Sequence, residues 1–400
     1  MIHRARIHCL GLVAVAWSCG SPDSPGSTRI DAEVGTIAVT VAPAVVFESS
    51  RSGYHTFRIP ALVALPNGSL LAFAEGRVDS AADNGNVDVL LRRSLDAGRS
   101  WSPLRTIADN ADGVAGNPAP VVERRSGDVI LFTTRNPVED PLRRSVWVQR
   151  TSDAGLTWSA AVNITTSVSQ TGWRWYATGP GHGIQLSAGP YRGRLVVAAA
   201  HTVEHESTGR RRGFHLLLSD DGGRSWRVGA SMEDSGWIEP SEAAVAELPD
   251  GRIIVNVRDQ GGTSPATRAV AQSDDGGTTF SQGLRSEDQL RAPVVHASLL
   301  GLPSGLLIFI APSHPTRRRR LQIRIASARV DSWTERSVIW PLAAGYSDVA
   351  LLDSETLAVL FESGVQDTRE AIRLAQVPLD FVDRSPTVMT RSRARSRVRP

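Results

Sequence analysis

The sequence predicts an all-β protein, a six-bladed β-propeller built from four-stranded antiparallel blades. The first observation is a short motif, Ser-x-Asp-x-Gly-x-x-Trp, whose Asp recurs at intervals of 57, 68 and 54 residues. The second is that short apolar runs alternate with turn signals between the copies, while no long stretch keeps a helical period. The third is the length of the repeat, because about 57 residues hold four short strands with their loops, and residues 37–382 hold six such units.

Each copy of the motif should form a tight turn. The Asp carboxylate can accept hydrogen bonds from backbone N–H groups of its own turn, and Gly can adopt the positive φ that the turn needs. The hydroxyl residue can tie the incoming strand to the turn, and the aromatic residue can pack beneath it. The copies are Ser94–Trp101, Thr151–Trp158, Ser219–Trp226 and Ser273–Phe280, with a worn copy without Gly at Ser327–Trp333.

The segments between the motifs read as β-hairpins. Two apolar runs, 61–65 and 69–73, flank the turn signal Pro66-Asn67-Gly68, and the same pattern recurs over residues 244–256. An early strand within 37–47 is expected to complete the last blade and so close the ring.

Both ends of the chain read as segments outside the propeller. Residues 1–19 have basic residues before a short apolar run, which is typical of a signal peptide and too short to span a bilayer. Cys19 is placed like the lipidated cysteine of bacterial lipoproteins, and ordinary secretion is the alternative. Residues 20–36 read as a flexible tether, and residues 383–400 as a disordered basic tail. The predicted protein is therefore exported, either extracellular or anchored to a membrane through Cys19.

The composition argues against several classes of partner. The net charge is only +3, lysine is absent, and five arginines lie in the last ten residues, so the body is close to neutral and nucleic acid is not expected. The two cysteines, Cys9 and Cys19, both fall in the signal segment, so no internal disulfide is predicted. No metal-ligand cluster or cofactor motif is recognisable, and a monomer is expected.

Two arginines in the first predicted blade lie in unusual settings. Arg58 follows an apolar residue in Phe57-Arg58-Ile59-Pro60, and a buried guanidinium needs a partner. Arg77 ends the next strand and precedes a loop, 78–86, that is dense in small polar residues. Together with the Asp motifs, this pattern resembles the bacterial and animal exo-sialidases, and the resemblance runs from Phe57 to Glu362.

The resemblance implies a clamp of three arginines for the carboxylate of sialic acid, since planar guanidinium groups can bind a carboxylate through two hydrogen bonds. It assigns these positions to Arg58, Arg258 and Arg318. Within the run from Arg317 to Arg320, Arg317 and Arg319 are the alternatives for the third position.

The resemblance also implies a tyrosine nucleophile, an exception among glycosidases. Tyr346 matches that position, and Glu242 matches the base that takes its proton, with Glu239 as the alternative. A phenol suits this substrate because a carboxylate nucleophile would be repelled by the carboxylate of sialic acid itself. Since a phenol titrates near pH ~10, it needs such a base to attack at neutral pH.

Asp83, six residues after Arg77, matches the acid/base that protonates the leaving oxygen and then activates water; Asp79 and Asp88 are the alternatives. Glu362 matches the carboxylate that orients Arg58.

Further residues are expected around the substrate. Arg77 and Asn117 correspond to positions that bind the hydroxyl side of the sugar, where many bacterial members have Asp in place of Asn117. Segment 173–176, with two Trp and one Tyr, is expected either to wall the N-acetyl pocket or to pack inside a blade. His182 is expected to be structural.

The sequence thus predicts a retaining exo-α-sialidase acting on sialylated glycoproteins, glycolipids or oligosaccharides. Two alternatives remain open. One is a non-catalytic propeller that binds glycans, and the other is a trans-sialidase or an enzyme that releases an anhydro product.

Overall fold

The computed structural model describes residues 42–205, 209–234, 236–262 and 266–383 of the 400-residue chain. Several sequence expectations lie outside the described residues: the signal segment 1–19 with Cys19, the tether 20–36, the first residues of the 37–382 region, and the tail from residue 384 onward.

The described part of the chain is all-β, which confirms the predicted class. Besides strands it has two one-turn helices, α1 (Thr165–Val168) and α2 (Asp380–Asp383). No helix among these residues has the length and the apolarity that crossing a membrane would require.

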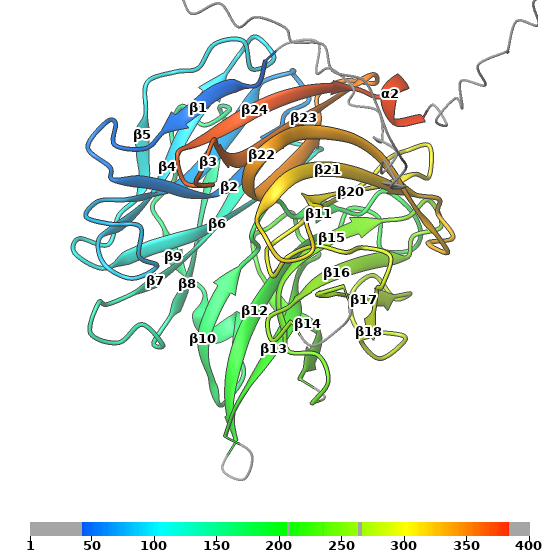
Figure 1. The fold of residues 1–400 in the computed structure, drawn as a ribbon. Coiled ribbons are helices and arrows are strands. Elements are labelled where there is room, and N and C mark those ends of the chain that lie inside the picture. The colour runs from blue at the N-terminus through cyan, green and yellow to red at the C-terminus, as the bar shows by residue number, and fades with distance from the viewer. Residues whose placement is uncertain (1–41, 206–208, 235, 263–265, 384–400) are drawn as a thin grey trace, which may run out of the picture. The chain divides into compact units, whose positions relative to one another are not determined.

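The strands form four sheets, in which an antiparallel module recurs along the chain (Figure 1). Modules 1 to 3 are β2 (Thr56–Ala64), β3 (Leu70–Arg77), β4 (Val87–Ser94) and β5 (Arg105–Ala108); β6 (Val114–Glu123), β7 (Asp128–Asn136), β8 (Ser145–Thr151) and β9 (Val162–Asn163); and β10 (Trp173–Thr178), β11 (Ile184–Gln185), β12 (Leu195–His205), β13 (Gly209–Ser219) and β14 (Arg227–Glu233). Modules 4 to 6 are β15 (Pro240–Glu247), β16 (Ile253–Asp259), β17 (Arg268–Ser273) and β18 (Arg285–Ser286); β19 (Ser298–Gly301), β20 (Leu307–Pro312), β21 (Arg319–Ala326) and the first half of β22 (Trp333–Leu351); and the second half of β22 with β23 (Thr356–Gly364), β24 (Ala371–Pro378) and β1 (Ala44–Glu48).

Strand pairing connects modules 5 and 6 to each other, and it connects the start of the described chain to module 6. Strand β22 pairs with β21 along its first half and with β23 along its second half, so one strand passes from module 5 to module 6. Strand β1 pairs antiparallel with β24, with Ala44 opposite Leu374. The expected early strand therefore completes the last module, although it begins at Ala44 in the described residues.

The Asp motifs form the turns that the sequence predicts. In one copy, Ser219 Oγ donates to Asp221 Oδ1 at 2.8 Å, and the N–H of Ser225 donates to the same oxygen at 2.9 Å. Trp226 packs edge-on against Phe132, with ring centres 4.6 Å apart. The same two hydrogen bonds recur in the other three copies. These Asp side chains therefore accept hydrogen bonds from residues of their own turns.

Irregular backbone at the start of β2 and β6 positions two candidate site residues. Ile59 and Asn117 both have φ in the left-handed region, at 52°, and each precedes a proline. The strand register shifts at both points, so each is a bulge that redirects the neighbouring side chains. A β-branched residue such as Ile59 rarely adopts this conformation, which costs roughly 1–3 kcal/mol and is found mostly at functional sites.

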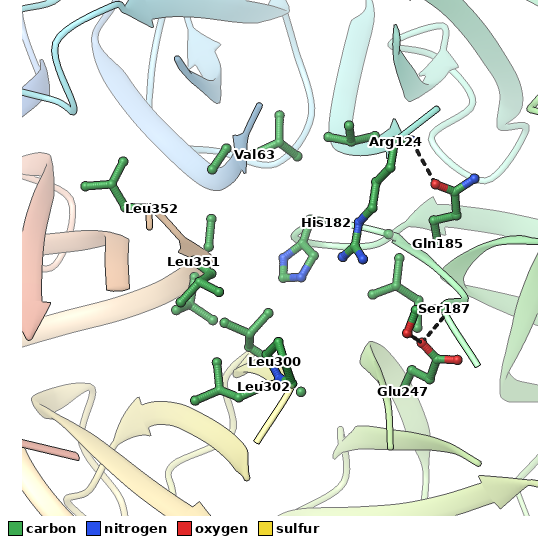
Figure 2. Close-up of a pocket in the computed structure, with 18 of the residues that line it drawn as sticks. Val63, Arg124, His182, Gln185, Ser187, Glu247, Leu300, Leu302, Leu351 and Leu352 are labelled. Carbon is green, nitrogen blue, oxygen red and sulfur yellow. Dashed lines mark hydrogen bonds between the residues drawn. The ribbon is translucent and has the colours of Figure 1, made fainter. Parts of the chain in front are cut away.

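A cavity of about 900 Å³ is lined by residues from all six modules. Five modules contribute the first strand or the turn after it, and module 3 contributes β11 with its flanking residues. Figure 2 shows side chains from these strands surrounding it. The lining includes Leu62–Leu65, Val122 and Arg124, His182–Gln185, Glu247–Pro249, Leu300–Pro303 and Val349–Asp353.

Candidate active site

Tyr346, Glu242 and Arg258 form one hydrogen-bonded cluster, drawn from β22, β15 and β16. The Tyr346 hydroxyl donates to Oε1 of Glu242 at 2.5 Å. Nη1 of Arg258 donates to Oε2 of Glu242 at 2.6 Å and to the Tyr346 oxygen at 2.8 Å. Tyr346 is 5% exposed, so a phenol, a carboxylate and a cation meet almost out of contact with bulk water.

The protonation states in this cluster are set by burial and by neighbouring charge. Burial raises the pKa of the Tyr346 phenol, the Glu242 carboxylate raises it further, and Arg258 lowers it only in part. Burial also raises the pKa of Glu242, but the charge of Arg258 and the hydrogen bond from Tyr346 help to outweigh burial, so that this pKa lies below its ordinary value. At neutral pH the proton therefore stays on Tyr346 and the negative charge stays on Glu242.

Arg58 and Arg318 lie against the same tyrosine. Their guanidinium carbons are 5.3 Å and 5.5 Å from the centre of the Tyr346 ring. Arg58 is 8% exposed and comes from β2, whereas Arg318 directly precedes β21 and donates to the carbonyl oxygen of Val294 at 3.1 Å. The three predicted clamp arginines thus converge on Tyr346.

Glu362, on β23, connects Arg58 to the backbone of Tyr346. Its Oε1 accepts from Nε of Arg58 at 2.6 Å and from the N–H of Ile59 at 3.1 Å. Its Oε2 accepts from the N–H of Tyr346 at 3.1 Å. Glu362 is completely buried, so this carboxylate fixes the bulge at Ile59 and the direction of Arg58 together.

The cluster carries more positive than negative charge. Three guanidinium groups, on Arg58, Arg258 and Arg318, face two carboxylates, on Glu242 and Glu362. In addition, the buried Nε of Arg258 has no hydrogen-bond partner within the described ranges. Because buried cations require compensation, this arrangement favours an anionic ligand.

The residues that the sequence left as alternatives for the third clamp arginine and for the base lie away from Tyr346. Arg317 and Arg319 are exposed, and no contact joins either of them to Tyr346 in the described part of the chain, whereas Arg318 is half-buried against it. Glu239 lies 3.6 Å from Nε of Arg212 and not beside Tyr346.

A second group forms around Arg77 at the end of β3. Nη1 of Arg77 lies 2.6 Å from Oδ1 of Asp83, and Nη2 lies 2.8 Å from Oε2 of Glu75. The other oxygen of Glu75 accepts from the N–H of Asn117 at 2.9 Å. Since Arg58 and Glu75 are register partners on β2 and β3, this group adjoins the first one.

Asp83 is the acidic loop residue that reaches Arg77. Its side chain is 84% exposed, which leaves its second oxygen accessible. Asp88 instead is buried in β4 and accepts from the hydroxyl of Tyr54 at 2.7 Å. Among the described residues, no contact links Asp79 to Arg77.

Asn117 is held in one orientation by its neighbours. Its Oδ1 accepts from Oγ1 of Thr134 at 2.9 Å and from Nη1 of Arg144 at 2.8 Å. Arginine can only donate, so this atom must be the amide oxygen and the NH₂ group points elsewhere. Arg144 stacks on Trp175, 4.8 Å from the ring centre to the guanidinium carbon, and burial lowers the pKa of Arg144 to about 10.

Sequence reasoning missed Glu75, Arg144, Arg268 and His296. Glu75 could have been found, because it lies two residues before Arg77 and therefore on the same face of the strand. Arg268 is the register partner of Arg258 and is fully buried, donating to Oδ1 of Asn256 at 2.8 Å. His296 is buried 5.7 Å from Tyr346 between ring centres, and burial lowers its pKa to about 4. No short motif marked the last three.

The residues of the aromatic segment 173–176 make different contacts. Trp175 faces the Asn117 group through Arg144, whereas Trp173 stacks on His201 with ring centres 3.6 Å apart. The Tyr176 hydroxyl is buried and lies 2.6 Å from Nε2 of His215. His182 lines the 900 Å³ cavity described above.

A separate pocket of about 760 Å³ opens beside the arginine cluster. It is lined by Arg58, Arg317–Arg319, Leu342, Ala343 and the segment Val365–Arg369. Within the described ranges, no group of three or more His, Cys, Asp or Glu side chains is arranged to hold a metal ion.

Residues 68–358 match the family described as BNR repeat-like domain. A sialidase from Micromonospora viridifaciens is 30% identical over 79% of the chain, and the chain spans 51% of that protein, about half of its length. Sialidase-3 from Bos taurus is 30% identical over 79% of the chain, which covers 88% of that protein. Among solved structures, the Hadza microbial sialidase Hz136 is similar with a TM-score of 0.74 and 26% identity, over 84% of this chain and 68% of that one.

Proposed function

Because the chain belongs to the sialidase family of glycoside hydrolases, whose members carry BNR repeats, we propose that it is an exo-α-sialidase. It removes terminal sialic acids from glycoproteins, glycolipids or oligosaccharides and retains the configuration at the anomeric carbon. The observation that carries the proposal is the buried cluster in which Tyr346 bonds to Glu242 at 2.5 Å while Arg258 donates to both.

The charge of the cluster supports sialic acid as the ligand. This sugar bears a carboxylate on the anomeric carbon, and Arg58, Arg258 and Arg318 present an excess of positive charge around Tyr346. A carboxylate held by these guanidinium groups places the anomeric carbon beside the Tyr346 oxygen. Binding and attack then use the same geometry.

In the first step, the Tyr346 oxygen attacks the anomeric carbon while its proton passes to Oε1 of Glu242. Proton transfer must accompany attack, because burial keeps the phenol protonated at neutral pH. The bond to the aglycone breaks, and Asp83 supplies a proton to the leaving oxygen. The product of this step is a tyrosyl-linked sugar.

In the second step, Asp83 removes a proton from water, and the water oxygen attacks the anomeric carbon. The bond to the Tyr346 oxygen breaks, and Glu242 returns the proton to it. Two inversions give net retention. Glu362 holds Arg58 in place throughout, while Arg77 and Asn117 bind the hydroxyl side of the sugar.

Turnover of a fluorogenic α-sialoside tests this function. Purified protein should release the fluorophore, NMR should detect the α-anomer of free sialic acid first, and Tyr346→Phe should nearly abolish turnover. Binding without turnover by the unsubstituted protein would favour a glycan-binding propeller. An anhydro sugar, or a sialylated acceptor, would identify one of the transfer reactions.

We also propose that the modules are the blades of a six-bladed propeller spanning residues 37–382. The cavity lined by residues of every module, and the pairing of β1 with β24, both support a ring. An experimental structure with fewer or more blades would contradict this.

The remaining proposals concern the ends of the chain and its assembly. Residues 1–19 would direct export and 20–36 would form a tether, with Cys19 lipidated and the protein monomeric. Because α2 includes Asp383, the proposed disordered tail is shortened to residues 384–400. Mass spectrometry of the mature N-terminus, with Cys19→Ser as the comparison, tests lipidation. Light scattering after size-exclusion chromatography tests the oligomeric state.

A further inference from the structure

The cavity of about 900 Å³ has the size and the lining of a ligand site, although it does not include the Tyr346 cluster. Pockets for small molecules typically have volumes of roughly 300–1,000 Å³ and mostly apolar walls with a few placed polar groups. Here Arg124 and His182 reach in among apolar side chains (Figure 2), and Gln185, Ser187, Glu247 and Asp353 are the other polar side chains of the lining. The apolar walls include Val63, Leu300, Leu302, Leu351 and Leu352.

Arg124 is a departure from the repeat. In modules 1, 4 and 5, the turn after the first strand reads Leu-Pro-x-Gly and closes through a 2.9 Å hydrogen bond from the Gly N–H to the Leu carbonyl oxygen. In module 2 the corresponding turn, Glu123–Gly127, is one residue longer, and it is closed by a 2.8 Å hydrogen bond from the N–H of Gly127 to the carbonyl oxygen of Glu123. Arg124 therefore occupies the place of a proline that lines the cavity in the other three modules. Module 2 thus has a cation where modules 1, 4 and 5 have an apolar residue, and module 6 has Asp353 at the equivalent position.

Arg124 is an exposed residue of the cavity lining whose guanidinium group is unpaired among the described residues. Its guanidinium group makes no hydrogen bond or ion pair with any residue that the structure describes. Two carboxylates also line the cavity, and neither is paired with Arg124. That of Glu247 accepts from the N–H and hydroxyl of Ser187, each at 2.7 Å, and from the N–H of Ala188 at 2.9 Å, and Oδ1 of Asp353 accepts from the N–H of Glu355 at 2.8 Å. A further acceptor for Arg124 would have to come from a ligand or from water.

His182 offers a second donor in a fixed orientation. Its Nδ1 lies 2.7 Å from Oδ1 of Asp348, a carboxylate that is 1% exposed. Asp348 is itself held by the N–H of Leu62 at 2.8 Å and the N–H of Val349 at 2.9 Å. With Nδ1 donating to Asp348, Nε2 is the ring nitrogen left to meet a ligand, and it donates there when the imidazole is protonated. Burial lowers the pKa of His182, but the charge and hydrogen bond of Asp348 raise it above its ordinary value, and the charge of Arg124 opposes this.

We propose that this cavity is a second binding site, which takes a small carboxylate with an apolar body. The carboxylate would accept from the Arg124 guanidinium and from Nε2 of His182, and the apolar body would lie against the leucines of the opposite walls. Charge-assisted hydrogen bonds from arginine are among the strongest available to a carboxylate. The proposal is independent of sialidase activity, since none of these residues contacts Tyr346.

Calorimetric titration with octanoate tests the proposal, with octanamide as the uncharged probe of the same shape. The chain provides a matched control: Arg125 is the next residue of the same turn, is exposed, and does not line the cavity. Octanoate should bind the unsubstituted protein and Arg125→Gln equally, and Arg124→Gln roughly tenfold or more weakly. Octanamide should bind all three proteins alike.

Two further readouts separate this proposal from the sialidase assignment and from misfolding. Circular dichroism should be unchanged in Arg124→Gln, and its turnover of a sialoside should equal that of the unsubstituted protein. Failure of octanoate to bind, or equal octanoate affinity in Arg124→Gln and Arg125→Gln, would overturn the second site whatever the outcome of the sialidase assay.

Discussion

The hydroxyl oxygen of Tyr346 lies 2.5 Å from Oε1 of Glu242, although 104 residues separate the two in sequence. The proton of this hydrogen bond is the one that must move when the phenol attacks. Replacing Glu242 with Gln keeps the size of the side chain but removes the proton acceptor. We expect kcat to fall by about 10²- to 10⁴-fold, the usual contribution of a general base.

Glu239→Gln is the matched control for this prediction. Glu239 lies three residues earlier and pairs with Arg212. The fall in kcat caused by Glu239→Gln should therefore be at least tenfold smaller than the fall caused by Glu242→Gln. The steady-state rate on a fluorogenic sialoside measures both. The reverse order of effects would assign the base to Glu239.

The pH dependence of turnover should respond to Arg258. The pKa of Glu242 is lowered in the folded protein, so Glu242 stays ionised, and able to take the proton, until the pH falls below its ordinary value of 4.5. Arg258→Gln removes the charge that outweighs burial, and the pKa of Glu242 should then rise. The acid limb of kcat against pH should shift to higher pH, whatever the loss in amplitude. An unmoved acid limb would exclude Glu242 as the group that sets it.

Glu362→Gln should destabilise the fold as well as the site. Glu362 is fully buried and provides the counter-charge for Arg58, so its neutralisation leaves a buried cation unpaired. We expect the free energy of unfolding to fall by about 3–5 kcal/mol, measured by urea denaturation. Glu355→Gln, at an exposed position just before β23, should stay within about 0.5 kcal/mol of the unsubstituted protein. Equal losses of unfolding free energy in the two variants would show that the ion pair between Arg58 and Glu362 does not stabilise the fold.

Arg144 should affect substrate binding more than chemistry. It holds Oδ1 of Asn117 and stacks on Trp175, so Arg144→Gln should let the amide of Asn117 rotate. We expect KM for a sialoside to rise roughly tenfold with little change in kcat, since about 1.4 kcal/mol of uniform binding is lost. Arg143→Gln is the control, because Arg143 is exposed and its guanidinium group lies 4.0 Å from the Asp140 carboxylate, away from Asn117. A drop in kcat with unchanged KM would contradict this role.

Three buried histidines should make the fold sensitive to mild acid. Burial lowers the pKa of His201 to about 3 and that of His296 to about 4, and it lowers the pKa of His215 well below its ordinary value. These groups stay neutral in the folded chain but bind protons in the unfolded chain below pH ~6.5. The free energy of unfolding should therefore fall as pH drops from 6.5 towards 5, by up to about 1.4 kcal/mol per pH unit for each histidine.

His201→Asn tests this dependence, because the Asn amide can replace Nδ1 in the hydrogen bond to His215, which is 2.9 Å long. The slope of the unfolding free energy against pH reports the number of protons taken up on unfolding. In the variant this number should be smaller by about one, even if the absolute stability is lower. His182 does not complicate this window. Its pKa is raised in the folded protein, so its contribution is fully present below pH ~6.5 and is lost only as pH rises through the folded value. An unchanged slope would mean that His201 is not the group that binds the proton.

The sequence by itself determined what depends on short-range interactions. Each Asp motif satisfies its hydrogen bonds within eight residues, as Ser219, Asp221 and Ser225 do, so the turn can be predicted wherever the pattern occurs. The repeat of that turn indicated an all-β chain of similar units. The unusual settings of Arg58 and Arg77 pointed to two groups of candidate site residues, and the resemblance that they supported supplied the rest.

Only the tertiary structure decided which other side chains contact those candidate site residues. It brings Arg318, and not Arg317 or Arg319, against Tyr346, because a loop residue's direction depends on the strand that it leads into. It brings Arg144 onto Asn117, and it opens a cavity around Arg124. Such contacts join different modules or distant loops, and a one-dimensional pattern does not encode them, since the partner of a buried charge is chosen by packing between strands and not by distance along the chain.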